Sequence, residues 1–232
     1  MARHHNSAVP EDLAAAVSLA PTLSVAGLGS QRGGRALFKG LDLSLRPGQL
    51  VWLRGRNGCG KTSLLRLLAG LSTPTRGAVF CDGTPLARCP TDWRRRLLYV
   101  AHANALKDDL SVLEALQFLG ALQGRAPAAG EIRRALDLLG VGHMHQSPVR
   151  TLSQGQRRRC ALARLALPQP ASVWLLDEPF DALDGEGVSA LHALLSRHVR
   201  GGGSALLTSH QHVSLRDPVP QPVNLDDFAI AA

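Results

Sequence analysis

The sequence predicts an α/β fold, in which a largely parallel sheet lies between layers of helices. Three observations support this prediction. The apolar strand pattern at 50–55 leads through a glycine-rich segment into a Leu-rich helix. A second apolar run, at 173–176, ends in two adjacent carboxylates, and strand and helix patterns alternate from there to residue 210. No clear strand pattern falls between about 104 and 171, which predicts an inserted helical subdomain at approximately 104–165.

Two short strands are expected near the N-terminus. Apolar and small or polar residues alternate at 23–28 and 41–45, as in short strands, and we assign them to a small antiparallel β part. The first helix should run from 63 to 69 and end at Gly70. The other expected elements are strands at 50–55, 77–83 and 97–100, the last after a basic turn, helices at 111–124, 130–141 and 186–199, and strands at 173–176 and 205–210.

We expect a single domain over 21–215, with a flexible N-terminal extension at 1–20 and a short C-terminal tail at 216–232. A cleaved targeting peptide is the alternative interpretation of the extension, although its apolar stretch is too short for a secretory signal. No apolar run reaches the ~18 residues that a membrane-spanning helix needs.

The composition of the chain indicates which classes of partner it is suited to bind. The chain carries 26 Lys and Arg against 18 Asp and Glu, a formal net charge of +8 at pH 7. These basic residues are scattered apart from two runs, Arg94–Arg96 and Arg157–Arg159, and such an excess suits anionic partners of any kind. Aromatic residues make up 4% of the chain, which disfavours base stacking, so we expect no nucleic-acid partner. The four cysteines form no C-x-x-C pair and indicate neither a zinc site nor a disulfide framework.

The segment GRNGCGKTS, 55–63, fits the phosphate-binding pattern G-x-x-x-x-G-K-[ST] between a predicted strand and a predicted helix. Its glycines let backbone N–H groups point at phosphate oxygens, and the helix adds the positive end of its dipole. Lys61 should reach the β- and γ-phosphates, and the Thr62 hydroxyl should bind Mg²⁺. The predicted nucleotide contacts are Gly55, Arg56, Asn57, Gly58, Cys59, Gly60, Lys61, Thr62 and Ser63.

Cys59 lies inside this loop, beside helix N–H donors that are expected to lower the pKa of its thiol. A small space-filling role is the simpler interpretation, and a redox role is the alternative.

Carboxylates and a histidine end the later strands. Asp177 and Glu178 follow the run VWLL, at the strand end that faces the ligand crevice of an open α/β sheet. Asp177 is placed to hold Mg²⁺, and Glu178 to polarise an attacking water. His210 ends another strand at the same edge and could contact the γ-phosphate or the water, although by itself it could be an ordinary loop histidine.

The order of these motifs, with LSQGQ at 152–156, LLDEP at 175–179 and ALD at 182–184, resembles the ATP-binding cassette (ABC) ATPases over nearly the whole chain. The resemblance implies a P-loop NTPase core and a homodimer in which two subunits sandwich two ATP molecules head to tail. It implies catalytic roles for Lys61, Glu178 and His210, and Mg²⁺ binding by Thr62 and Asp177. It also implies a D-loop aspartate, Asp184, and a signature peptide of Ser153, Gln154, Gly155 and Gln156 that acts on the partner's ATP.

Three positions depart from the common pattern of that family. Gln154 stands where a glycine is usual. His102 stands where the Q-loop glutamine is expected, and imidazole is a poorer ligand for hard Mg²⁺. Our hypothesis is that His102 couples the site to the partner subunit and adds pH sensitivity. Arg32 takes the place of the adenine-stacking aromatic, where a guanidinium plane could stack instead.

The signature peptide is expected to cap a helix that starts at about Gln156, with Thr151 or Ser153 as the capping residue. The three arginines at 157–159 should then lie on the first turns of this helix, adding positive potential near phosphates or facing solvent.

Softer similarities, such as LLYVAHANALK at 97–107, resemble the ATPase subunits of the bacterial haem exporters of cytochrome c maturation. This resemblance implies integral membrane partners of the CcmB and CcmC type, at the cytoplasmic face of the inner membrane, and haem handled by the complex. The histidines of GHMHQ, 142–146, and His4–His5 are expected to be loop residues rather than haem ligands. The alternatives are another ABC importer or exporter, and a non-transport cassette protein.

Overall fold

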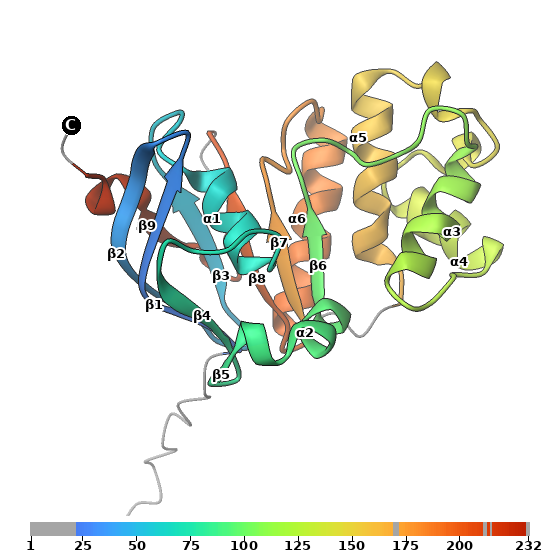
Figure 1. Cartoon of the computed structure of the whole chain (residues 1–232). Helices are drawn as coiled ribbons and strands as arrows, with labels where there is room; N and C mark the ends of the chain where they lie inside the picture. Colours follow the sequence, from blue (N-terminus) through green and yellow to red (C-terminus); the bar gives the residue numbers. More distant parts are fainter. Residues whose placement is uncertain (1–21, 169–171, 211–212, 214, 231–232) are drawn as a thin grey trace, which may run out of the picture.

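A computed structural model of the chain describes residues 22–168, 172–210, 213 and 215–230. The predicted extension at 1–20, with His4 and His5, lies outside these residues. Within them, two sheets and six α-helices form a layered core with a helical lobe to one side (Figure 1). The predicted α/β class is therefore confirmed.

The central sheet is wholly parallel. Its order is β6 (Leu97–Val100), β7 (Val173–Leu176), β8 (Ser204–Thr208), β3 (Leu50–Arg54) and β9 (Gln221–Asn224). Buried parallel strands read as continuous apolar runs because both faces are covered. In β3, Val51 and Leu53 pack into one hydrophobic cluster, and Leu50 and Trp52 into the other. The sheet is thus the middle of three layers.

One face of this sheet is covered by α1 (Lys61–Leu68) and by the antiparallel sheet, whose order is β2 (Arg35–Leu45), β1 (Leu23–Arg32), β4 (Arg76–Cys81) and β5 (Thr84–Pro85). The other face is covered by α6 (Gly185–Arg200), through its buried Leu191, Leu194 and Leu195. The small antiparallel part that the sequence predicts is therefore present.

The helical lobe contains α3 (Val112–Leu122), α4 (Ala129–Leu138) and α5 (Gln154–Leu162). In Figure 1 it stands beside β6, opposite the antiparallel sheet. The described residues between β6 and β7 contain no strand, as expected. The signature helix α5 begins at Gln154, two residues before the expected start, because Ser153 caps it.

Two expectations were wrong. The basic turn before β6 is a helix, α2 (Pro90–Arg96). Pro90 at its first position favours a helix start, and buried Trp93 anchors it by donating an indole hydrogen bond of 2.9 Å to the carbonyl of Leu68. The expected C-terminal tail instead supplies β9, which pairs with β3 at the sheet edge, where its Pro222 is tolerated.

Candidate functional site

The predicted phosphate-binding loop, residues 55–60 and called the phosphate loop below, connects β3 to α1 at the carboxyl end of the parallel sheet. Gly60, directly before α1, has φ +112°. A Cβ at Gly60 would lie 3.1 Å from Cδ1 of Phe38 and 3.2 Å from Cβ of Leu37, so glycine is needed for both the backbone angle and the space. This turn directs the N-terminus of α1 into a cleft of about 420 Å³.

The cleft gathers most of the predicted site residues. Its lining includes the loop and helix start, both carboxylates, the strand-end histidine, and two of the three residues that depart from the family pattern. These lining residues are Arg32, Leu37, Asn57, Gly58, Gly60, Lys61, Thr62, Ser63, His102, Asp177, Glu178, Asp181 and His210.

Lys61 is buried at the mouth of the loop. Its Nζ donates hydrogen bonds to the carbonyl oxygens of Gly55, at 2.8 Å, and Arg56, at 3.3 Å. An ammonium group held on two loop carbonyls is positioned to exchange them for phosphate oxygens, which carry more charge.

Asp177, which directly follows β7, accepts hydrogen bonds from residues of α1 and β8. It is 1% exposed; its Oδ2 accepts from the hydroxyl of Thr62 at 2.8 Å, and its Oδ1 from the hydroxyl of Thr208 at 2.9 Å. A hydroxyl and a carboxylate side by side in a phosphate cleft fit Mg²⁺, which usually takes one or two protein oxygens and completes its shell with phosphate and water. The described part of the chain contains no group of three or more His, Cys, Asp or Glu that could hold a metal ion.

Glu178 is the next residue and is also buried. Its N–H donates to the hydroxyl of Thr208 at 2.8 Å, and its backbone takes a φ of +46°, which residues with a Cβ seldom adopt. Burial raises the pKa of Glu178, and the opposing charge of His210 only partly offsets this. The imidazole Nε2 of His210 lies 3.3 Å from Oε1 of Glu178, and the His210 N–H donates to Oε2 at 3.1 Å.

His102 and Arg32 line the same cleft from its rim. His102 Nδ1 lies 3.8 Å from Oδ2 of Asp181, and both side chains are exposed, so this pair is weak in water. Arg32 is exposed as well.

Two predictions for Cys59 differ from the structure. Its side chain packs against the hydrophobic cluster beneath the loop rather than lining the cleft, and its thiol sulfur lies 2.7 Å from where a Cβ on Gly55 would stand. Burial therefore raises the pKa of the Cys59 thiol, where we expected the helix N–H groups to lower it. The space-filling interpretation fits this placement.

The signature peptide lies away from the cleft, since none of its residues is among the cleft lining. Ser153 caps α5: its hydroxyl accepts from the N–H of Gln156 at 3.2 Å, and Gln156 Oε1 accepts from the Ser153 N–H at 2.9 Å. Ser153 and Gln154 are exposed. A Cβ at Gly155 would come within 2.9 Å of the carbonyl oxygen of Ala182, so this glycine allows the D-loop to pack against α5.

None of the three arginines of α5 lines the cleft, and Arg158 and Arg159 are buried where we expected them to face solvent or phosphates; Arg157 is partly exposed. Arg157 donates to the carbonyl of Val149 and pairs with Asp108. Arg158 and Arg159 are buried and bind the chain around them. Each guanidinium is held by oxygens of this chain, which explains why a basic run lies in a packed helix.

Asp184 caps α6. Its Oδ1 accepts from the N–H of Gly187 at 2.9 Å and also from Arg159. Both bonds stabilise the ionised carboxylate and lower its pKa. The D-loop is thereby fixed between the signature helix and α6.

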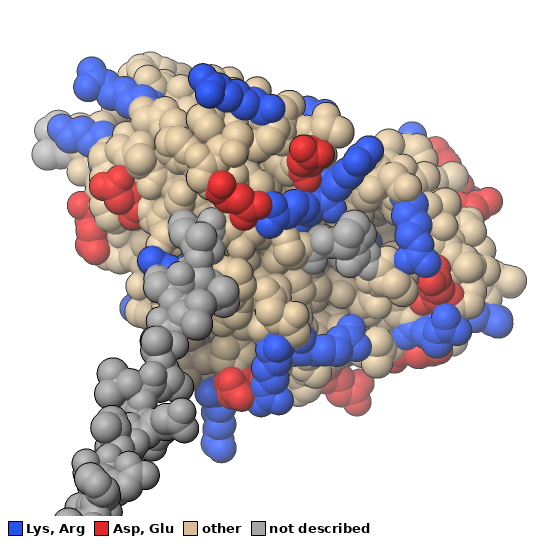
Figure 2. Space-filling model, turned by 90° about the horizontal axis from the view of Figure 1, so that it is seen from below, with Lys and Arg blue, Asp and Glu red and all other residues tan. Residues whose placement is uncertain are grey.

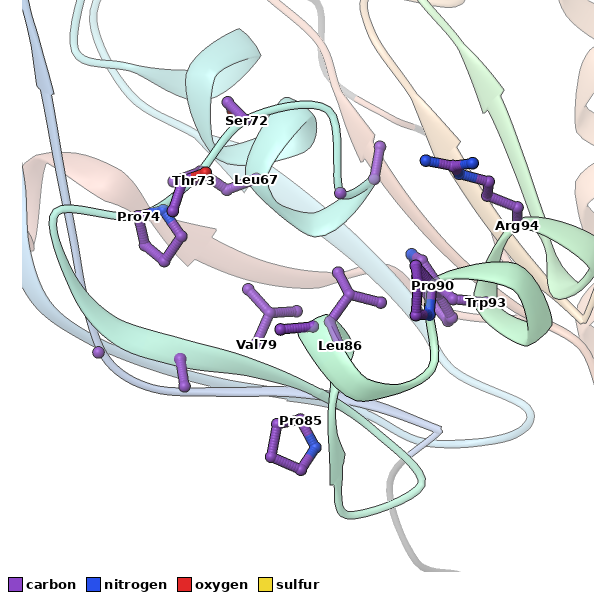
Figure 3. A pocket seen from close by; sticks show the side chains of 15 residues that line it. Leu67, Ser72, Thr73, Pro74, Val79, Pro85, Leu86, Pro90, Trp93 and Arg94 are labelled. Carbon is purple, nitrogen blue, oxygen red and sulfur yellow. The ribbon is translucent and has the colours of Figure 1, made fainter.

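A second hollow, of about 390 Å³, lies between α1, β4 and α2 (Figure 3). Its walls are mostly apolar, including Leu67, Val79, Leu86 and Trp93, with Arg94 among the lining residues. None of the predicted site residues is among those that line it.

Charged residues of both signs are mixed on the face of the molecule that Figure 2 draws. In Figure 2, Lys and Arg side chains are spread over the lower face, with acidic ones between them, rather than gathered in one patch. No helix among the described residues is long and apolar enough to cross a membrane.

Comparison with known sequences decides the family, because residues 38–181 match the family described as ABC transporter. The chain belongs to the ABC transporter family of ATP-binding proteins. It is 46% identical over 195 residues to the cytochrome c biogenesis ATP-binding export protein CcmA of Albidiferax ferrireducens, covering 84% of this chain and 92% of that protein. It is 48% identical over 209 residues to CcmA of Pseudomonas savastanoi pv. phaseolicola, covering 90% and 97%.

Solved structures of ABC cassettes share the fold. An ATP-binding subunit of an ABC transporter superposes with a TM-score of 0.72 at 25% identity, covering 82% of this chain and 79% of that one. A dimeric ATP-binding cassette in a post-hydrolysis state, bound to ADP and Pi, gives a TM-score of 0.72 at 21% identity, covering 82% and 88%.

Four residues around the site were not predicted from the sequence. Thr208 hydrogen-bonds to both Asp177 and Glu178, Asp181 lies near His102, and Arg158 donates to the carbonyl of Glu178. Asp226, in the 3-10 turn Leu225–Phe228, accepts the N–H of Arg56 at 3.0 Å. The position of Thr208 near the end of β8 could have signalled it, but nothing in the local sequence marks the other three.

Proposed function

We propose that this ABC ATPase hydrolyses MgATP to drive the haem exporter of cytochrome c maturation, from the cytoplasmic face of the inner membrane. The observation that carries the enzymatic part is the constellation of Lys61, Thr62, Asp177, Glu178 and His210 around one cleft. The names of the relatives, cytochrome c biogenesis ATP-binding export proteins, support the transport part.

In this proposal the chain binds the phosphates through the backbone of residues 55–60, the N-terminus of α1 and the ammonium of Lys61. Thr62 and Asp177 would hold Mg²⁺, which would supply positive charge to neutralise the phosphate oxygens. Glu178 accepts the proton of the attacking water, a role that suits a carboxylate with a raised pKa. His210 orients that carboxylate through its N–H and its imidazole.

The second half of each site comes from another copy of the chain. Ser153, Gln154, Gly155 and Gln156 lie outside the cleft of their own chain. Ser153 and Gln154 are exposed at the N-terminus of α5, the helix end that attracts anions. A homodimer would bring this signature peptide to the γ-phosphate of the partner's ATP. The dimeric ADP-bound cassette of the same fold supports such an arrangement.

The proposed partners are integral membrane subunits of the CcmB and CcmC type, with haem handled by the complex. The test has two parts. The chain is expressed in a bacterial strain from which the gene for its own cytochrome c biogenesis ATP-binding export protein has been deleted, and it is purified by affinity from the membranes of these cells. We expect restored covalent haem in c-type cytochromes, co-purified membrane subunits, and no restoration by Glu178→Gln. Co-purification of a different transporter's membrane subunits, without restoration, would reassign the transported substrate while leaving the ATPase in place.

A further inference from the structure

Arg158, on α5, contacts the turn that carries Asp177 and Glu178. Arg158 is 3% exposed, and the two terminal nitrogens of its side chain donate four hydrogen bonds. Nη2 donates to the carbonyl oxygens of Asp177, at 3.0 Å, and Glu178, at 2.7 Å. Nη1 donates to the carbonyl of Ala101, at 3.1 Å, and Oδ1 of Asn104, at 2.9 Å. One guanidinium therefore binds the carboxylate turn and the loop on both sides of His102.

The two successive carbonyls fix the conformation of the turn. Glu178 has a φ of +46°, which costs free energy for a residue with a Cβ and persists only where the surroundings determine it. Two bonds from one nitrogen hold the carbonyls on either side of that strained dihedral. Since the backbone of Glu178 sets where its carboxylate points, Arg158 controls the direction of the carboxylate without touching the reacting atoms.

The burial of Arg158 is costly. Desolvation lowers its pKa, the nearby carboxylates of Asp177, Asp181 and Glu178 oppose this, and its buried Nε has no hydrogen-bond partner in the structure. A charge kept in such a place is poorly explained by stability alone, because well-packed apolar residues often replace buried ions without loss.

We propose that Arg158 is a positioning residue for hydrolysis: it holds the turn of Asp177 and Glu178 in the conformation that aims the Glu178 carboxylate. This inference rests on the proposed role of Glu178 as the base. It also makes the signature helix, the catalytic turn and the His102 loop one mechanical unit within the chain.

Arg157 offers a matched control. It is the adjacent arginine of the same helix, but it binds only the carbonyl of Val149, at 3.1 Å, and the carboxylate of Asp108, at 2.7 Å. Arg157→Gln removes the same charge from α5 without altering the catalytic turn.

The experiment compares Arg158→Gln with Arg157→Gln in the full chain, by ATPase kinetics, binding of a fluorescent ATP analogue and thermal unfolding. We expect Arg158→Gln to lower kcat at least 30-fold with the Kd of the nucleotide within twofold of wild type. Arg157→Gln should keep kcat within twofold. A kcat within threefold of wild type for Arg158→Gln, or an equal loss in both variants, would overturn the proposal. If Arg158→Gln does not fold, Arg158→Lys keeps the charge but reaches fewer of the oxygens, and the same limits apply to it.

A double-mutant cycle separates positioning from a general structural role. In a Glu178→Gln background, adding Arg158→Gln should change the single-turnover hydrolysis rate less than threefold, because the group that Arg158 positions is already removed. A further 30-fold loss there would refute action through Glu178. Full turnover by Glu178→Gln itself would instead refute the proposed function, and so the two failures are distinguishable.

Discussion

His210 contacts the carboxylate of Glu178 at two points: its N–H donates to Oε2 of Glu178 at 3.1 Å, and its Nε2 lies 3.3 Å from Oε1. The two residues follow neighbouring strands, β7 and β8, which pair in parallel register. Both carboxylate oxygens are therefore oriented by one residue, and the carboxylate is held by backbone and side chain together. This contact makes the properties of Glu178 depend on His210.

Replacing the glutamate should abolish turnover without loss of binding. We expect Glu178→Gln to lower kcat by about 10²- to 10⁴-fold, the usual range for a general base, and to accumulate an ATP-bound dimer in size-exclusion chromatography. Glu186→Gln is the control, because Glu186 lies on the exposed first turn of α6 and its side chain is 92% exposed. Retention of more than a tenth of the wild-type kcat by Glu178→Gln would remove Glu178 from this role.

The raised pKa of Glu178 predicts an acid limb in the pH profile of kcat. A base acts in its ionised form, so activity is present above the raised pKa and is lost as the pH falls through it. Because the charge of His210 lowers the pKa of Glu178, removing it should move the limb to higher pH. The pH profiles of kcat for wild type and His210→Ala would check this; a limb that stays in place or moves to lower pH contradicts it.

The C-terminal segment should contribute to nucleotide affinity. Asp226 accepts a hydrogen bond from the N–H of Arg56 at 3.0 Å and forms an ion pair with the Arg56 side chain at 3.3 Å. Both contacts stabilise the conformation of the phosphate loop. Loss of about 1 kcal/mol, typical of one hydrogen bond, would raise the Kd for ATP about fivefold in Asp226→Ala. Asp227→Ala is the control: Asp227 is the next residue of the same turn, and its carboxylate accepts a hydrogen bond from the side-chain amide of Asn224 at 3.0 Å rather than from the loop, so this variant should bind ATP as wild type does. Equal affinity for ATP in the two variants, measured by titration calorimetry, would show that the contact of Asp226 with Arg56 does not contribute to nucleotide binding.

How much of this site could be predicted depends on how local each contact is. The phosphate loop and the strand-end carboxylates are contiguous in sequence, and parallel strands bring their carboxyl ends to one edge, so these residues were predictable. Asp226 could not be, because β9 joins the sheet only through its pairing with β3. Arg158 reaches the turn of Asp177 across 19 and 20 residues of chain, and burial reverses the solvent-facing role that its basic neighbours suggest.

His102 should affect coupling more than binding. Its contact with Asp181 is 3.8 Å long and solvent-exposed, so little stability depends on it. We expect His102→Gln to leave the Kd for ATP and the melting temperature unchanged, while altering the pH dependence of cytochrome c maturation in complemented cells. An unchanged pH dependence of maturation in this variant would show that His102 has no coupling role.

Gly155 should be essential for ATP-driven dimerisation. A Cβ there would come within 2.9 Å of the Ala182 carbonyl oxygen, which is backbone and cannot rotate aside, so alanine must push the D-loop away from α5. In a Glu178→Gln background, Gly155→Ala should therefore shift ATP-dependent dimer formation to at least tenfold higher protein concentration, with ATP binding to each chain intact. Gly185→Ala is the matched control, since a Cβ at that first residue of α6 meets nothing within 4 Å. Analytical ultracentrifugation measures both variants, and equal dimerisation would show that the D-loop tolerates the added methyl group.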